Sequence, residues 1–253
     1  SLDYGNMAVL ERGYGIPLRH LSAFCGSVYG SSAHKKLRQA LSVMGTKLDG
    51  QIIARHPGYG MDDRLLFNAV DFDRFTVKID GKTYPLNTTD FPTVDPADPY
   101  RLSPEEERLV AEYVSAFRES RELRRHMDFL YKNGSTYLCR NGNLLYHGCI
   151  PMTEDGAFAR VRHGGNWYAG RALMDYADKV VTAAWTRGDE SALDMMWYLW
   201  CGKNSPFSGR EFHTFERAFL DDEAAWAEPK NPYFDLWEDA EVMGRILGEF
   251  GLD

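Results

Sequence analysis

The sequence predicts a mixed α/β fold of the α+β kind, in which helices and antiparallel hairpins occupy separate segments. Several stretches repeat apolar residues every three or four positions, as one face of a helix requires. Two other stretches alternate apolar and polar residues around Asp80-Gly81 and Asn141-Gly142, which are dipeptides typical of tight hairpin turns. The chain has 253 residues, of which 44% are hydrophobic, so it can bury a sizeable core.

The first elements are predicted to be helical. A short apolar run from Leu18 to Phe24 precedes Ser31 and Ser32, which can cap a longer helix. That helix is expected to end at His56-Pro57-Gly58, because proline disfavours helix in the residue before it. Its apolar stripe consists of Leu37, Leu41, Met44, Leu48 and Ile52.

A hairpin is predicted over residues 71–86, followed by an extended, proline-containing loop over residues 87–102. The segment Ser103-Pro104-Glu105-Glu106 begins the next helix, because serine caps it, proline suits its first position and Glu106 completes a capping box. A further helix is expected to end at Asn133-Gly134. The apolar positions expected to face the core are Leu109, Val110, Tyr113, Val114 and Phe117 in the first helix, and Leu123, Met127 and Leu130 in the second.

The second half begins with a hairpin over residues 135–147. After a polar loop, a helix is predicted from Ala172 to Ala184. The run from Leu193 to Trp200 is apolar nearly all round and is therefore expected to be deeply buried. A last helix is expected over residues 238–249. We therefore divide the chain into a mostly helical part with one hairpin, residues 1–134, and a part with strands and helices, residues 135–253.

Composition excludes several classes of function. The formal net charge is −8, so an anionic ligand must be held by a local basic cluster or by metal, and a general nucleic-acid-binding surface is not expected. No run approaches the roughly 20 apolar residues of a membrane span. The cysteines form no CxxC pair, which is typical of a reducing compartment, and we expect a cytoplasmic protein. They are Cys25, Cys139, Cys149 and Cys201.

His147 is the most informative candidate for chemistry. It is expected at the C-terminal end of a buried strand, and Gly148 would let the chain turn away and leave room for an ion, so the pair suits a metal site. The residues alone leave a second interpretation open, in which His147 is a hydrogen-bonded core residue. Cys149 is expected to be a small buried residue rather than a nucleophile.

The segment around this histidine resembles the hallmark segment of class III fructose-1,6-bisphosphatases. It runs from Leu144 to Met152 and is followed by Glu154-Asp155-Gly156. Blocks elsewhere are similar to the same family, in the same order and over nearly the whole chain. These blocks are Leu48–Ile53, Met61–Leu66, Asp90–Pro96, Met196–Trp200, Gly202–Pro206, Thr214–Arg217 and Lys230–Tyr233.

The resemblance implies the calcineurin-like metallophosphoesterase fold, in which two metal ions lie at strand ends of a β-sandwich flanked by helices. Family ligands come from an Asp-x-His, a Gly-Asp-x-x-Asp-Arg, a Gly-Asn-His-Asp, a strand-end His-Gly and a late Gly-His. This chain holds only the His-Gly, at His147. The resemblance thus implies a central fragment, inactive alone, with part of the sandwich in residues 135–253 and a mostly helical insertion in residues 1–134.

The activity that the resemblance implies for the intact enzyme is hydrolysis of fructose 1,6-bisphosphate to fructose 6-phosphate and phosphate, a step of gluconeogenesis. Two divalent ions, with manganese expected, would activate water and polarise the phosphoryl oxygens. Basic and hydroxyl side chains in a Gly/Pro-rich stretch are candidates to bind substrate phosphate. They are Lys203, Ser205, Ser208, Arg210, Arg217 and Lys230.

Other interpretations remain open at this point. The basic stretch could be a solvated loop, or Arg217 could pair with a carboxylate on its own helix. The protein could be a related metallophosphoesterase acting on phosphoproteins or nucleotides, or a non-catalytic helical module for regulation or oligomerisation. Apolar surface left by absent sheet partners would favour a homo-oligomer.

Overall fold

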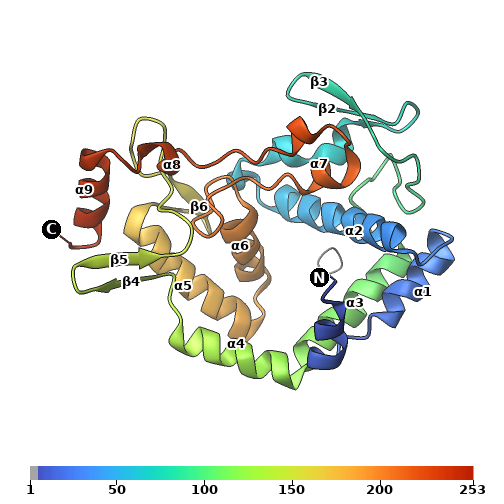
Figure 1. The fold of residues 1–253 in the computed structure, drawn as a ribbon, viewed down its shortest axis with the longest axis horizontal. Helices are drawn as coiled ribbons and strands as arrows, with labels where there is room; N and C mark the ends of the chain where they lie inside the picture. Colours follow the sequence, from blue (N-terminus) through green and yellow to red (C-terminus); the bar gives the residue numbers. More distant parts are fainter. Residues whose placement is uncertain (1–4, 253) are drawn as a thin grey trace. The chain divides into compact units, whose positions relative to one another are not determined.

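The computed structural model describes residues 5–252 and divides the chain into two compact units. Unit 1 consists of Ser1–Arg55, Asp63–Lys132 and Thr214–Trp226; unit 2 consists of His56–Asp62, Asn133–His213 and Ala227–Asp253. Helices predominate, and the sheets are small and antiparallel, so the predicted mixed α/β class is confirmed (Figure 1). That residues 1–134 are an insertion in a larger core stays a prediction.

Unit 1 is built from helices and one small sheet. Its helices are α1 (Arg19–Val28), α2 (His34–Arg55), α3 (Pro104–Glu119), α4 (Arg121–Asn133) and α7 (Thr214–Phe219). Its strands are β1 (Val70–Asp71), β2 (Thr76–Ile79) and β3 (Lys82–Pro85), in the order β1-β2-β3. The β2–β3 turn has positive φ at both Asp80 and Gly81, as a type I′ turn requires, so the predicted hairpin is confirmed.

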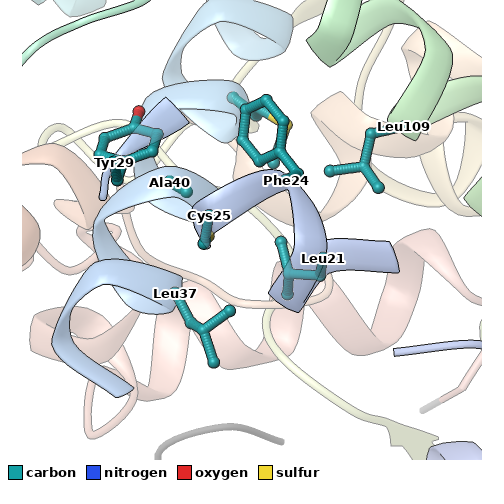
Figure 2. Packing of buried hydrophobic residues seen from close by; sticks show 8 residues of the cluster. Leu21, Phe24, Cys25, Tyr29, Leu37, Ala40 and Leu109 are labelled. Atoms are coloured by element: carbon teal, nitrogen blue, oxygen red, sulfur yellow. The ribbon is translucent and has the colours of Figure 1, made fainter. Parts of the chain in front are cut away.

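Two apolar clusters hold unit 1 together. One joins α1, α2 and α3 around Phe24, Cys25 and Leu109 (Figure 2). The other packs Phe67 and Val77 against Phe215 and Phe219 of α7. Each cluster thus joins residues far apart in sequence, and the second also packs against apolar side chains of the loop between β3 and α3.

Two ion pairs, one fully buried and one largely buried, link the elements of unit 1. Lys47 on α2 and Glu106 on α3 are fully buried, with Nζ and Oε2 2.7 Å apart. The guanidinium of Arg64 donates two hydrogen bonds, of 2.7 and 2.8 Å, to the two carboxylate oxygens of Glu216. Such a paired geometry compensates for the loss of hydration of both charges.

Unit 2 combines two hairpins with helices. Its strands are β4 (Tyr137–Arg140), β5 (Asn143–Tyr146), β6 (Val161–His163) and β7 (Asn166–Tyr168), paired as β4-β5 and β6-β7. Its helices are α5 (Gly170–Arg187), α6 (Glu190–Cys201), α8 (Tyr233–Leu236) and α9 (Ala240–Glu249). The β4–β5 turn has positive φ at Asn141 and Gly142, as predicted. An apolar cluster places Ile150 and Met152 against Met174 of α5 and Ile246 of α9.

Burial differs from the expectation at several apolar positions. Helix α6 buries only one face, with Met195 and Leu199 fully enclosed, so the prediction that Leu193–Trp200 is deeply buried is wrong at both ends. The reason is that α6 packs mainly on α5, which covers one stripe of its surface. The expected core positions exposed in the same way are Leu41, Val114, Phe117 and Leu130. Among residues 5–252, no helix has the length and hydropathy that crossing a membrane requires.

Candidate functional site

His147 follows directly after strand β5 in unit 2 and is exposed. Within the part of the chain that the structure describes, neither imidazole nitrogen has a hydrogen-bond partner, so the alternative of a hydrogen-bonded core histidine is wrong. The expectation that His147 ends a buried strand is also wrong, since Leu145 on β5 and Leu138 opposite it are about half exposed. Both ring nitrogens are therefore available to coordinate a metal ion or to form a hydrogen bond with a bound molecule.

Gly148 fixes the direction in which the chain leaves β5. A Cβ atom at this position would lie 2.4 Å from the carbonyl oxygens of both Pro206 and Phe207. The next residue, Cys149, donates its amide to the Pro206 oxygen at 3.0 Å. Segment 147–149 is thus held against segment 205–209, which brings His147 and the Gly/Pro-rich stretch into one region of unit 2.

Cys149 is completely buried beneath this contact. Burial raises the pKa of its thiol to about 12, and its sulfur contacts the Ser205 carbonyl oxygen at 3.5 Å. A thiol with so high a pKa is protonated at neutral pH and is a poor nucleophile. Cys149 is therefore a core residue, as the sequence suggested.

Two aromatic rings line the surface beside His147. The Trp200 ring, at the end of α6, lies nearly parallel to the imidazole, with an interplanar angle of 9° and centroids 6.5 Å apart. The Phe212 ring stacks against Trp200, and the centroids of these two rings are 6.4 Å apart. Trp200 is 48% exposed, which leaves much of the indole open to solvent. The apolar run Leu193–Trp200 predicted that Trp200 is buried, so the periodicity of the sequence did not reveal this exposed aromatic surface.

Arg210 and Lys230 lie directly opposite each other on two short antiparallel segments. The amide of Glu211 donates to the Pro229 oxygen at 3.0 Å, and that of Asn231 to the Gly209 oxygen at 2.9 Å, with Arg210 and Lys230 bridged between them. This is a non-hydrogen-bonded pair, in which side chains lie close together on one face. Both residues are exposed, and neither has an ion-pair partner among residues 5–252.

Like charges directly opposite each other destabilise a strand pair unless an anion neutralises them. Buried Asn231 holds the Lys230 segment in place, since its side-chain oxygen accepts hydrogen bonds from the amides of Met152 and Tyr233 at 2.9 and 3.0 Å. The fold therefore fixes the backbone positions of Arg210 and Lys230. Two cations this close together can bind a phosphate group.

The other predicted phosphate-binding residues of unit 2 have further partners. Lys203 is 3.6 Å from the carboxylate of Glu211. The Ser208 hydroxyl accepts from the Arg210 amide and donates to the Arg210 carbonyl oxygen. Ser205 is fully buried: its hydroxyl donates to the Leu199 oxygen at 2.6 Å and accepts from the amides of Phe207 and Ser208. The two hydroxyls thus shape the turn that carries Arg210.

Arg217 lies on α7, in unit 1, and the other five predicted residues lie in unit 2. Its guanidinium donates to the carbonyl oxygen of Trp226 at 3.4 Å. The neighbouring residue Glu216 pairs with Arg64 instead.

A metal centre needs several ligand side chains that lie close together. Among residues 5–252, no group of three or more His, Cys, Asp or Glu side chains is arranged to hold a metal ion. Within the described chain, His147 thus belongs to no such group.

Comparison with known proteins gives a consistent result. The family model of Firmicute fructose-1,6-bisphosphatases matches residues 1–253. The chain is 41% identical to the class 3 fructose-1,6-bisphosphatase of Clostridium novyi, with 100% of this chain and 42% of that protein covered. It is 40% identical to the class 3 enzyme of Ligilactobacillus salivarius, covering 98% of this chain and 42% of the relative.

The enzyme of the same name from Parabacteroides distasonis is 39% identical, with 99% of this chain and 42% of that protein covered. The chain thus spans about 42% of the length of these curated relatives. No solved structure gives a significant match. The family match extends over every residue of the sequence, and the resemblance first seen around His147 is confirmed: this chain belongs to the Firmicute fructose-1,6-bisphosphatase family.

Proposed function

We propose that the protein to which this chain belongs is a metal-dependent phosphatase that hydrolyses fructose 1,6-bisphosphate to fructose 6-phosphate and phosphate, a cytoplasmic step of gluconeogenesis. The match of the family model over residues 1–253 carries this proposal. The relatives, which are named class 3 fructose-1,6-bisphosphatases, are more than twice as long as this chain. The chain alone is proposed to be inactive, because its described residues offer one metal ligand.

His147 is proposed to be one ligand of a pair of divalent ions, with Mn²⁺ the expected metal, in a calcineurin-like metallophosphoesterase centre. Its support is chemical: the imidazole is exposed, has no hydrogen-bond partner in the described part of the chain, and directly follows strand β5. The remaining ligands would come from other parts of the longer protein.

Arg210 and Lys230 are proposed to bind a phosphate group of the substrate. Their side chains emerge side by side from a fixed strand pair, in a chain whose net charge is −8. Lys203, partly neutralised by Glu211, would add a third cation, while Ser205 and Ser208 hold the turn in shape. A charge-assisted hydrogen bond contributes about 1.5–3 kcal/mol, so loss of both cations should weaken substrate binding at least tenfold.

The test uses the full-length protein with fructose 1,6-bisphosphate as substrate. The double variant Arg210→Gln/Lys230→Gln is expected to raise KM at least about tenfold. The control Lys179→Gln/Arg187→Gln removes two exposed cations of α5 in the same unit and should leave KM unchanged. An unchanged KM in the first variant would remove these residues from the substrate site.

A substrate panel separates the sugar phosphatase from the related enzyme classes. Phosphate release from fructose 1,6-bisphosphate is expected to exceed release from a nucleoside monophosphate and from a phosphoserine peptide. Equal rates on all three would contradict the bisphosphate as the natural substrate. Failure of the whole protein to hydrolyse any of them would support a non-catalytic module instead.

A further inference from the structure

Unit 1 contains a pocket of about 280 Å³ that the proposed chemistry at His147 does not use. It lies between the first turns of α2, the loop that follows β3, and the segment from α7 to Trp226. All of its lining residues belong to unit 1, so the pocket is a feature of that unit alone. Its size suits a small metabolite rather than a macromolecule.

The charged residues that line the pocket are three cations and one carboxylate. Lys35 and Arg38 lie one turn apart on the same face of α2, and Arg217 comes from α7; the carboxylate is that of Asp221. Cations at this spacing on a helix repel each other. An excess of positive charge in a chain of net charge −8 marks a place where an anion is favoured.

The single carboxylate, that of Asp221, accepts a hydrogen bond that helps to hold the pocket wall. The Asn87 side-chain amide donates to Asp221 Oδ1 and to the Ala218 oxygen, both at 3.3 Å, while the Asn87 backbone amide donates to the Phe219 oxygen at 2.9 Å. These bonds fix the loop after β3 to the end of α7. Lys35, by contrast, is exposed and has no ion-pair partner among residues 5–252.

The walls of the pocket are held by hydrogen bonds. The Trp226 indole donates to the Leu220 oxygen at 3.0 Å, which orients its ring, and Gln39 donates to the Thr88 hydroxyl at 3.2 Å. The backbone oxygen of Trp226 also accepts from Arg217. A site whose walls are already ordered binds without a large ordering cost. Its lining residues thus include three cations and one aromatic ring of fixed orientation.

We propose that this pocket binds a small phosphate monoester, with its dianionic group against Lys35, Arg38 and Arg217 and its remainder against Trp226. Two sources can supply that chemistry. One is the second phosphate of the substrate, a case that rests on the proposed function; the other is a separate phosphorylated metabolite. Binding itself requires no turnover, so it can be measured independently of hydrolysis.

The experiment titrates the full-length protein with glycerol phosphate by calorimetry after metal has been removed by a chelator. The background variant Arg210→Gln/Lys230→Gln keeps the proposed substrate site from binding the probe. Adding Lys35→Gln and Arg217→Gln should weaken binding at least tenfold. Adding Arg74→Gln and Arg108→Gln instead, which removes two exposed cations of the same unit, should leave binding unchanged.

Two further measurements complete the test. If the pocket variant does not fold, Lys35→Gln alone is used, since this exposed side chain has no hydrogen bond or ion pair in the described chain. KM for fructose 1,6-bisphosphate is then compared in the otherwise unchanged protein. A tenfold rise identifies the substrate's second phosphate as the ligand, and an unchanged KM identifies a separate metabolite. Equal probe affinity with and without the pocket substitutions, or no binding at all, would overturn the proposal.

Discussion

Position 148 shows how one residue can fix a site, because the backbone of another segment lies where a side chain would begin. The change Gly148→Ala places a methyl group 2.4 Å from two carbonyl oxygens, and neither oxygen can rotate away. The backbone must then separate from segment 206–207, and the 3.0 Å hydrogen bond from Cys149 to Pro206 is weakened. We expect a loss of stability of about 1–3 kcal/mol, measured by thermal unfolding.

Gly244→Ala is the matched control in unit 2. This glycine lies inside α9, and an added Cβ would meet nothing within 4 Å. Alanine there should stabilise the protein by about 0.5–1 kcal/mol, because it restricts the unfolded chain. Equal changes in stability from the two substitutions would show that position 148 accommodates a methyl group without displacing segment 206–207.

We expect His163 to make the stability of unit 2 depend on pH. Its ring is buried and bonded to the hydroxyls of Tyr176 and Ser191, at 2.6 and 3.0 Å. Burial, and then the neighbouring His56, lower its pKa below the ordinary value of 6.5, although Asp189 and Asp194 act in the opposite direction. The unfolded chain therefore takes up the proton first. Stability is full above about pH 6.5 and declines as the pH falls below it.

The measurement is urea unfolding between pH 7.5 and 5.5. His163→Gln should flatten the decline by up to about 1.4 kcal/mol per pH unit, the contribution of one proton. Ser191→Ala removes one hydrogen bond but leaves the ring able to titrate, so it should lower stability while keeping the slope. A His163→Gln slope equal to that of the unsubstituted protein would assign the pH dependence to other groups.

At the scale of elements, the largest expected effect on stability comes from the buried ion pair between Lys47 on α2 and Glu106 on α3. Thr93 belongs to the same network: its hydroxyl donates to Glu106 at 2.6 Å, and its carbonyl oxygen accepts from Lys47 at 2.6 Å. Lys47→Met leaves the Glu106 carboxylate buried without its counter-charge. Removing one member of a buried pair costs about 3–5 kcal/mol, and chemical denaturation should show a loss of that order.

Removing both charges tests the same idea in reverse. Lys47→Met/Glu106→Gln should recover much of the lost stability, because an amide can still accept the 2.8 Å hydrogen bond from the Ser103 backbone without carrying a charge. Lys35→Met, an exposed position of the same helix, should change stability by about 0.5 kcal/mol or less. A double variant less stable than Lys47→Met would contradict an electrostatic cause.

Local chemistry made several elements predictable. The capping box at Ser103 and Glu106 is present with both of its hydrogen bonds, and the two predicted hairpin turns adopt positive φ where Asn-Gly and Asp-Gly allow it. The β6–β7 hairpin was missed, although Gly164-Gly165 at its turn is a signal of the same kind. The two-residue strand β1 is too short to show a period.

Long-range contacts could not be predicted in this way. The capping motif assigned Glu106 to a helix cap but could not reveal that Lys47 would meet it, 59 residues away in sequence. Exposure of Val114 and Trp200 depends on which neighbours cover a helix face. At the site, family resemblance directed attention to His147, whereas the pairing of Arg210 with Lys230 became visible only in the folded chain.

At the scale of the whole molecule, we propose that the metal ligands are divided between this chain and further sequence of the kind present in its longer relatives. The relatives are covered over about 42% of their length, and the described residues hold no cluster of three metal ligands. One imidazole binds a divalent ion weakly, whereas a two-metal centre needs several imidazole and carboxylate ligands around both ions. Metal affinity should therefore depend strongly on chain length.

The purified 253-residue chain is expected to bind Mn²⁺ below one equivalent and to show no hydrolysis of fructose 1,6-bisphosphate, by elemental analysis and phosphate release. The full-length protein should retain two equivalents, and His147→Ala in it should lower both metal content and kcat. His34→Ala, an exposed histidine at the start of α2, provides the matched control. Because the imidazole of His147 is the chain's proposed share of the centre, a tightly held metal pair with turnover in the 253 residues alone would contradict this division of ligands.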